Sequence, residues 1–273
     1  MADNESKTTV VLVHGAFADA SGWYGVIREL QSAGIPVLAP PNPERGLALD
    51  AASVGAFVAA IDGPVLLVGH SYGGAIITQA SATLNNVVGL VYLAAFGLDE
   101  GESVGAVQAP FAVPLLAANA RPSTYDAVGA AGGPELYIDL ATFRETFCSD
   151  LPADLSSVMA VSQRPVAAAT LNENCTAAGW KTLPSWYMVA AGDNAINPDV
   201  QQFMAQRMGA TTQTIQASHC AFISRPVETA AFISNIRSTA NAGCMLRARR
   251  SCYSLTMKPT TSGSMASKTQ RLA

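Results

Sequence analysis

The sequence contains few histidines: only three occur among its 273 residues. Two of them belong to short glycine-containing motifs, His14 before Gly15 and His70 after Gly69. His219 is the remaining imidazole. Because a catalytic serine needs a base of this kind, any mechanism in which histidine activates a serine points to His219.

Charged residues are also scarce, at 13%, whereas hydrophobic residues make up 49%. This composition, with 22 glycines and 15 prolines, suits a buried parallel sheet covered by helices on both faces. A length of 273 residues fits one α/β domain. We find no apolar stretch long enough to span a bilayer, and residues 1–7 are polar, unlike a signal peptide. We therefore expect a cytoplasmic protein that does not bind membranes.

The five cysteines are an odd number and lack any C-x-x-C spacing, which argues against a disulfide framework. Only Cys220 stands next to a histidine, so we expect no metal site.

Acidic residues are absent from the end of the chain. Residues 1–240 hold ten Lys and Arg and all 20 Asp and Glu, whereas residues 241–273 hold six Lys and Arg and no acid. Without apolar periodicity, 241–273 is expected to be a disordered or loosely docked basic tail. Six charges spread over this segment are too sparse to indicate a nucleic-acid partner. Residues 1–240 form the predicted domain.

Apolar runs alternate with helix-like segments along this domain, which predicts an α/β fold with a doubly wound, mainly parallel six-stranded sheet. Between about 98 and 183 the alternation is interrupted by glycine, alanine and proline, and we interpret this segment as an inserted helical cap with short helical patches, such as 135–147. The expected strands are 8–14, 35–40, 64–68, 87–93, 185–191 and 211–217, and the expected helices are 22–33, 49–61, 72–84, 198–208 and 226–238.

A Gly-x-Ser-x-Gly motif centred on Ser71 lies between a predicted strand and a predicted helix. A sharp strand-to-helix turn strains the serine and exposes its hydroxyl, and the glycines on both sides leave room for that turn. The motif therefore predicts that Ser71 is a nucleophile.

The remaining catalytic groups follow from their places at strand ends. His219 follows the last predicted strand and is the expected base. Asp193, after the preceding strand, is the expected carboxylate, and Asp99 in a charged run is the alternative. His14 and His70 are expected to have structural roles.

Two backbone N–H groups are expected to hold the oxyanion. One belongs to Tyr72, after the nucleophile, and the other to Ala16 in the loop after the first strand, with Phe17 as the alternative. The substrate pocket is predicted from large side chains near these elements, namely Phe17, Phe143, Trp180 and Phe222.

With these residues in place, the chain resembles the α/β-hydrolase family, and within it the compact plant methylesterase and hydroxynitrile lyase group. The resemblance rests on Val11-Leu-Val-His-Gly-Ala16, Gly22-Trp23, Val68-Gly-His-Ser-Tyr-Gly-Gly74, Val91-Tyr-Leu-Ala-Ala-Phe96, Asp193 with Ile196, and His219. It implies a triad of Ser71, Asp193 and His219 without a cofactor.

The resemblance also implies two possible reactions. One is hydrolysis of a small carboxylic ester or lactone through an acyl-enzyme, and the other is cyanohydrin cleavage. We expect the hydrolysis. Similar lyases use a threonine beside the oxyanion loop and a lysine after the histidine, where this chain has Gly15 and Cys220. The alternatives are lyase or perhydrolase chemistry with the same triad, or a non-catalytic ligand receptor. The oligomeric state stays open, with a homodimer as one option.

Overall fold

The computed structural model describes residues 7–124 and 133–240, so the predicted basic tail 241–273 lies outside the described residues. Six parallel strands form one sheet in the order β2-β1-β3-β4-β8-β9, which confirms the predicted α/β fold class. The strands are β1 Thr9–Val13, β2 Val37–Leu38, β3 Val65–His70, β4 Val87–Leu93, β8 Ser185–Ala190 and β9 Thr211–Ile215.

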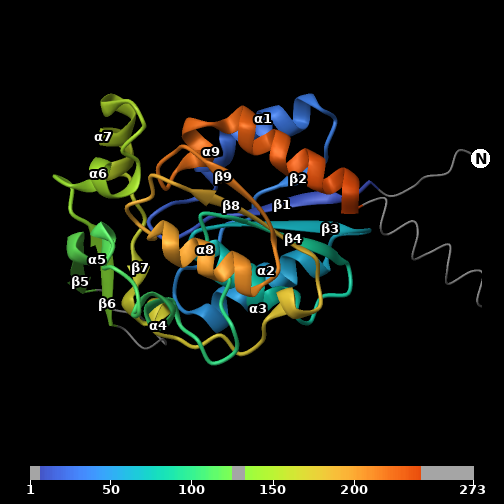
Figure 1. The fold of residues 1–273 in the computed structure, drawn as a ribbon, viewed down its shortest axis with the longest axis horizontal. Helices are drawn as coiled ribbons and strands as arrows, with labels where there is room; N and C mark the ends of the chain where they lie inside the picture. Colours follow the sequence, from blue (N-terminus) through green and yellow to red (C-terminus); the bar gives the residue numbers. More distant parts are fainter. Residues whose placement is uncertain (1–6, 125–132, 241–273) are drawn as a thin grey trace, which may run out of the picture.

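Helices cover both faces of this sheet (Figure 1). In that view α1 and the helix formed by residues 226–240 lie on one side of the sheet, and α2 and α3 lie on the other. The helices of the sheet layer are η1 Ala20–Trp23, α1 Tyr24–Ser32, α2 Leu47–Ala59, α3 Tyr72–Ser81, α8 Pro198–Arg207 and α9 Ala221–Ser224.

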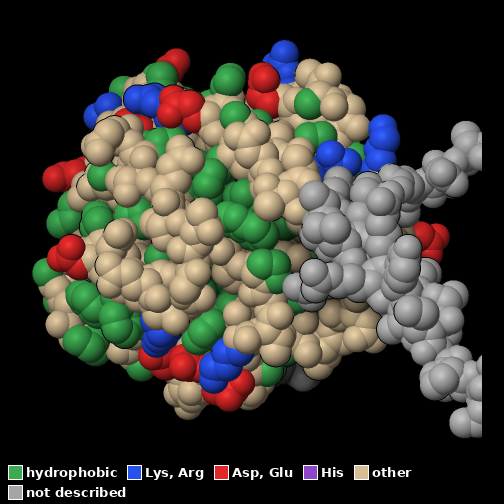
Figure 2. All heavy atoms as spheres, turned by 45° about the vertical axis from the view of Figure 1, so that its right-hand side comes forward, with side chains coloured by type: hydrophobic (Ala, Val, Ile, Leu, Met, Phe, Trp, Pro, Cys, Tyr) green, Lys and Arg blue, Asp and Glu red, His purple; other side chains and the backbone are tan. Residues whose placement is uncertain are grey.

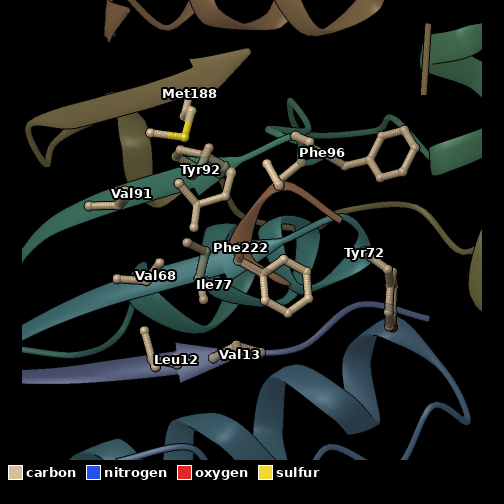
Figure 3. Close-up of a cluster of buried hydrophobic side chains, with 14 of the residues drawn as sticks. Leu12, Val13, Val68, Tyr72, Ile77, Val91, Tyr92, Phe96, Met188 and Phe222 are labelled. Atoms are coloured by element: carbon tan, nitrogen blue, oxygen red, sulfur yellow. The ribbon is translucent and has the colours of Figure 1, made fainter. Parts of the chain in front are cut away.

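The core lies between the sheet and its helices. All residues of β1 and β3 are buried, as expected for central parallel strands that are covered on both faces. Figure 3 shows side chains from β1, β3, β4 and α3 gathered together, among them Leu12, Val68, Val91 and Ile77. This rigid layer carries the loops that hold the candidate site.

The segment between β4 and β8 forms the cap, which is the part of the fold that we predicted least well. It contains helices, as expected, but also a three-stranded antiparallel sheet. The predicted helical patch 135–147 is correct only at its end, because its first residues belong to β6. Leu136, Tyr137 and Ile138 favour a strand, and they pair with β5. The cap elements are α4 Val104–Gln108, α5 Leu115–Asn119, β5 Ala120–Thr124, β6 Pro134–Ile138, α6 Phe143–Phe147, α7 Ala153–Val161, β7 Val166–Ala167, η2 Ala168–Leu171 and η3 Gly179–Lys181.

The surface in Figure 2 shows acidic and basic side chains next to one another in small clusters, separated by apolar and neutral polar area. Within the described ranges 7–124 and 133–240, no helix is both long and apolar enough to cross a membrane.

Candidate active site

Ser71 occupies the sharp turn between β3 and α3, with φ 54° and ψ −125°. This is a strained conformation for a residue with a side chain, and it turns Ser71 out of the strand into the site. The flanking glycines are required by close backbone contacts: a Cβ on Gly69 would lie 2.6 Å from the carbonyl oxygen of Gly73. The local sequence thus produces the predicted strand-to-helix turn, which we call the elbow.

Gly15 lies against the elbow from the loop after β1. A Cβ there would lie 2.6 Å from the Cβ of Ser71 and 2.9 Å from the backbone oxygen of His70. Neither of these atoms can rotate away, so a side chain at position 15 has to displace the serine.

We therefore expect Gly15→Ala to lower turnover roughly a hundredfold, because a displacement of about 1 Å at a reacting group has an effect of this size. The matched control is Gly55→Ala in α2, where the nearest atom to a new Cβ is 3.9 Å away. Turnover of a model ester and thermal unfolding of both variants check this. Full activity in Gly15→Ala would show that Ser71 does not need its observed position.

His219 and Asp193 form a buried pair at the ends of β9 and β8. The His219 Nδ1 atom lies 2.7 Å from Asp193 Oδ2, and both side chains have no exposed surface. The other ring nitrogen, Nε2, is buried and has no hydrogen-bond partner among the described residues. The carboxylate therefore fixes the tautomer that leaves a lone pair on Nε2.

Asp193 is itself held by several donors. Its Oδ1 atom accepts hydrogen bonds from the backbone N–H groups of Ala195 at 2.7 Å and Ile196 at 2.9 Å. Its Oδ2 atom also accepts a hydrogen bond from Gln201 Nε2 at 2.7 Å. These bonds fix the orientation of the carboxylate toward His219.

Sequence reasoning missed Gln201, which is fully buried in α8. Besides its bond to Asp193, its amide donates to Ile196 O at 2.9 Å and accepts from the Ala190 N–H at 3.0 Å. The position of Gln201 in this amphipathic helix did not indicate a contact with Asp193, because that contact depends on how α8 packs against β8.

Asp150 of the cap was missed as well. It accepts hydrogen bonds from the Ser218 N–H, at 3.2 Å, and from the Ser218 hydroxyl. Burial raises the pKa of the Asp150 carboxyl, but hydrogen bonds from Ser218 and Ser224 outweigh it, so the pKa is lowered. The cap thus holds the residue next to His219.

Asp99, the alternative acid, lies elsewhere. Its carboxylate is 2.6 Å from Lys181 Nζ, and this hydrogen bond lowers the pKa of Asp99. The Asp99 side chain is 32% exposed, so it forms a surface ion pair, whereas the carboxylate that contacts His219 belongs to Asp193.

The predicted oxyanion donors border the same space as Ser71. Ala16, Phe17 and Tyr72 line one cavity together with Ser71. Tyr72 is the first residue of α3, where helix N–H groups have no partner within the helix. Figure 3 shows its side chain pointing toward α2, and there its hydroxyl donates to Asp50 Oδ2 at 2.7 Å. This bond fixes the first residue after the nucleophile.

The structural roles predicted for His14 and His70 agree with their contacts. His14 Nε2 accepts the backbone N–H of Asn42 at 3.2 Å, and the Asn42 amide donates to the His14 carbonyl at 3.1 Å. His70 Nε2 donates to the backbone oxygen of His219 at 3.0 Å. His70 therefore holds the backbone of His219, and His14 holds the loop after β2.

Glu44 is buried beside His14, with 3.4 Å between His14 Nδ1 and Glu44 Oε1. Arg164 Nε lies 4.0 Å from the other carboxyl oxygen. Burial raises the pKa of Glu44 to about 7, although His14 and Arg164 act in the opposite direction. The folded protein therefore binds a proton at Glu44 that the unfolded chain releases near its ordinary pKa of 4.5.

We expect Glu44 to make the protein less stable as the pH rises. Its contribution is fully present below about pH 4.5, the unfolded pKa, and is lost as the pH passes through about 7. The free energy of unfolding should fall by about 3 kcal/mol at most over this window. Denaturant unfolding at several pH values should show a smaller fall for Glu44→Gln, and an unchanged fall for exposed Glu29→Gln. An equal fall in the wild type and Glu44→Gln would contradict this assignment.

The predicted pocket residues are only partly brought together. Phe17 lines the Ser71 cavity, which has a volume of about 90 Å³. Phe143 and Phe222 line a neighbouring cavity instead. Trp180 borders neither cavity: its Nε1 donates to Leu98 O at 2.8 Å, and Lys181 and Arg207 lie over its ring. Trp180 therefore lies near surface charges, where η3 places it. Within the described part of the chain, no group of three or more His, Cys, Asp or Glu side chains is arranged to hold a metal ion.

Comparison with known families decides the classification. The model of the "Alpha/beta hydrolase family" matches residues 10–232, which include every residue of the candidate site. The chain belongs to the alpha/beta hydrolase family. The predicted family is thus confirmed.

Two known proteins are similar in sequence. "Probable hydrolase R7" of Phoma sp. is 27% identical over 219 residues, covering 72% of this chain and 82% of that protein. "Alpha/beta hydrolase nvfD" of Aspergillus novofumigatus is 26% identical over 244 residues, covering 81% of this chain and 92% of that protein.

Solved structures of hydrolases share the fold. Polyneuridine aldehyde esterase superposes with a TM-score of 0.73 and 19% identity, covering 84% of this chain and 99% of the esterase. The methylesterase MES16 from Arabidopsis gives 0.71 with 18% identity, covering 85% and 99%. A pyrethroid hydrolase from Sphingobium faniae JZ-2 gives 0.71 with 22% identity, covering 85% and 97%. The likeness in fold thus extends to the compact plant esterases.

Proposed function

We propose that this chain hydrolyses small carboxylic esters or lactones through an acyl-enzyme on Ser71. The observation that carries the proposal is the buried His219–Asp193 pair, whose Nε2 atom lacks a partner among the described residues. A lone pair at this place is what a serine hydroxyl needs when it gives up its proton. The esterases that share the fold support the same reaction class.

In the proposed first step, Ser71 Oγ attacks the ester carbonyl carbon while His219 Nε2 takes the hydroxyl proton. The carbonyl oxygen becomes an oxyanion, and the backbone N–H groups of Tyr72 and Ala16 donate to it. When the intermediate collapses, His219 returns its proton to the departing alkoxide, and the acyl group stays on Ser71.

Water then attacks the acyl-enzyme. His219 Nε2 takes a proton from this water, a second tetrahedral intermediate forms in the same oxyanion site, and the carboxylic acid leaves as His219 reprotonates Ser71 Oγ. Asp193 stabilises the imidazolium in both halves of the reaction, so one ester and one water yield one acid and one alcohol.

Lyase chemistry is the less favoured alternative for two structural reasons. The threonine of similar lyases would stand at Gly15, where even a Cβ meets Ser71 at 2.6 Å. Their lysine would stand at Cys220, which is fully buried, and burial raises the pKa of its thiol. A neutral thiol offers no cation to hold cyanide. Perhydrolase activity would use the same three residues and is compatible with the proposal.

A panel of p-nitrophenyl esters of increasing acyl length, together with small lactones, tests the proposed function. We expect Ser71-dependent turnover of the shorter members, measured by release of p-nitrophenol or by titration of acid. The matched control is Ser81→Ala. Ser81 is the last residue of α3, the helix that follows Ser71, and its hydroxyl donates to Thr78 O. Binding of these compounds without turnover would instead identify a receptor built on the same fold.

A further inference from the structure

Two apolar cavities meet at the loop after β1. The first, which we call the Ser71 chamber, has a volume of about 90 Å³ and is bordered by Ser71 and Tyr72. The second chamber has a volume of about 230 Å³. Its walls include Phe143, Phe147, Met159, Cys220 and Phe222. Among the described residues, Phe17 is the one side chain that borders both chambers.

The position of Phe17 is tightly defined. Its backbone has a positive φ of 63°, its carbonyl accepts the Arg164 N–H at 3.4 Å, and only 4% of the residue is exposed. Its ring meets the ring of Phe147 edge-on, with 6.3 Å between the centroids. Phe147 in turn packs on the His219 ring at 5.0 Å. Aromatic rings therefore separate the second chamber from the catalytic groups.

The walls of the second chamber are of two kinds. Phe143, Phe147 and Phe222 are buried aromatic side chains, whereas Asp19, Ser21 and Tyr24 are exposed to solvent. An apolar chain attached to the ester carbonyl would find its complement at the aromatic walls. Phe17 borders this space as well as the Ser71 chamber.

We propose that Phe17 is the residue that determines substrate size: it divides the apolar space beside Ser71 and limits the ester to short acyl and alkoxy groups. This inference rests on the proposed ester hydrolysis. An ester has two groups that diverge from its carbonyl carbon, and the Ser71 chamber is less than half as large as the second chamber. Removing the Phe17 ring joins the chambers and admits a long chain.

The test compares acetyl and decanoyl p-nitrophenyl esters, and methyl and hexyl acetates, in wild type and Phe17→Ala. We expect the wild type to prefer the short member of each pair. In Phe17→Ala the ratio of kcat/KM for long over short should rise at least about tenfold in one series, because every additional methylene that becomes buried favours binding. Phe57→Ala, an exposed phenylalanine of α2 that borders neither chamber, should leave both ratios unchanged.

A second variant identifies the space that is used. In Phe17→Ala/Met159→Trp the indole fills part of the second chamber, so the gain with long substrates should disappear. Persistence of the gain would place the long chain outside the second chamber and overturn the inference. If Phe17→Ala does not fold, Phe17→Leu serves as the smaller change in the same comparison.

Calorimetric titration with decanoate separates failure of this inference from failure of the proposed function. Even without any ester turnover, Phe17→Ala should bind decanoate at least about tenfold more tightly than the wild type does. Equal decanoate affinity together with unchanged ester ratios would overturn the partition. A wild-type protein that already turns over decanoyl esters as well as acetyl esters would overturn it too.

Discussion

Ser71→Ala and His219→Ala are each expected to lower ester turnover roughly a thousandfold or more while the protein stays folded. Without the Ser71 hydroxyl no acyl-enzyme can form, and without His219 no base accepts the hydroxyl proton. Because the two groups act as one unit, the double variant should lose little more than either single variant. Steady-state kinetics with the best short ester check all three proteins.

The elbow geometry supports the expectation that these variants fold. Alanine is smaller than serine and adopts the same backbone conformation, and a shortened His219 loses one hydrogen bond to Asp193. Thermal unfolding should confirm the fold of each variant. Turnover near the wild-type level in either folded variant would remove the proposed mechanism.

Asp193→Asn is expected to lower kcat by several orders of magnitude, whereas Asp99→Asn should change it less than about tenfold. An amide in place of Asp193 would present its NH2 group to His219 or to Gln201, and it would favour the wrong tautomer of the imidazole. Asp99, by contrast, pairs with Lys181 at the surface. Comparing the two variants therefore tests which of the two candidate residues, Asp193 or Asp99, is the catalytic acid. Their positions after strands did not decide between them.

Gln201, which positions Asp193, provides a control for this comparison. Gln201→Leu removes one donor to Asp193 and leaves the carboxylate, so it should lower kcat less than Asp193→Asn does. A larger loss in Asp99→Asn than in Asp193→Asn would move the catalytic acid to the residues after β4.

The sheet could be predicted because its central strands contain continuous runs of apolar residues. The strands predicted at 8–14 and 64–68 correspond to β1 Thr9–Val13 and β3 Val65–His70, since both faces of these strands are buried. The turn at Ser71 was predictable for a related reason: Gly69 is required by contacts with the backbone of Gly73 and Gly74, a few residues along the chain, although Gly73 meets the backbone of Val13 and His14.

The cap was less predictable because its elements are short and depend on distant partners. Residues 134–138 form a strand only because β5 and β7 pair with them. The same dependence explains why the predicted pocket residues lie at different cavities. Phe17 and Phe143 are both large and apolar, but Phe17 borders both chambers and Phe143 borders only the second, a difference that depends on tertiary packing.

The contact between Gln201 and Asp193 could not be predicted from the sequence around Gln201. A glutamine in an amphipathic helix is ordinarily solvent-exposed, and only the packing of α8 on β8 brings its amide to Asp193. The place of Asp193 at the sheet edge was predictable because it follows the buried strand β8 closely in the sequence. The hydrogen bond that Gln201 donates to Asp193 therefore depends on tertiary packing, whereas the position of Asp193 follows from the neighbouring sequence.

The central claim, that Ser71 is the nucleophile of an ester hydrolase, is tested most directly by covalent labelling with a fluorophosphonate. Ser71 Oγ should displace fluoride from phosphorus, and mass spectrometry should find one adduct per chain, mapped by peptide fragmentation to Ser71. The adduct should be absent from Ser71→Ala and retained in Ser81→Ala. A label on another residue, or a label that persists in Ser71→Ala, would contradict the account.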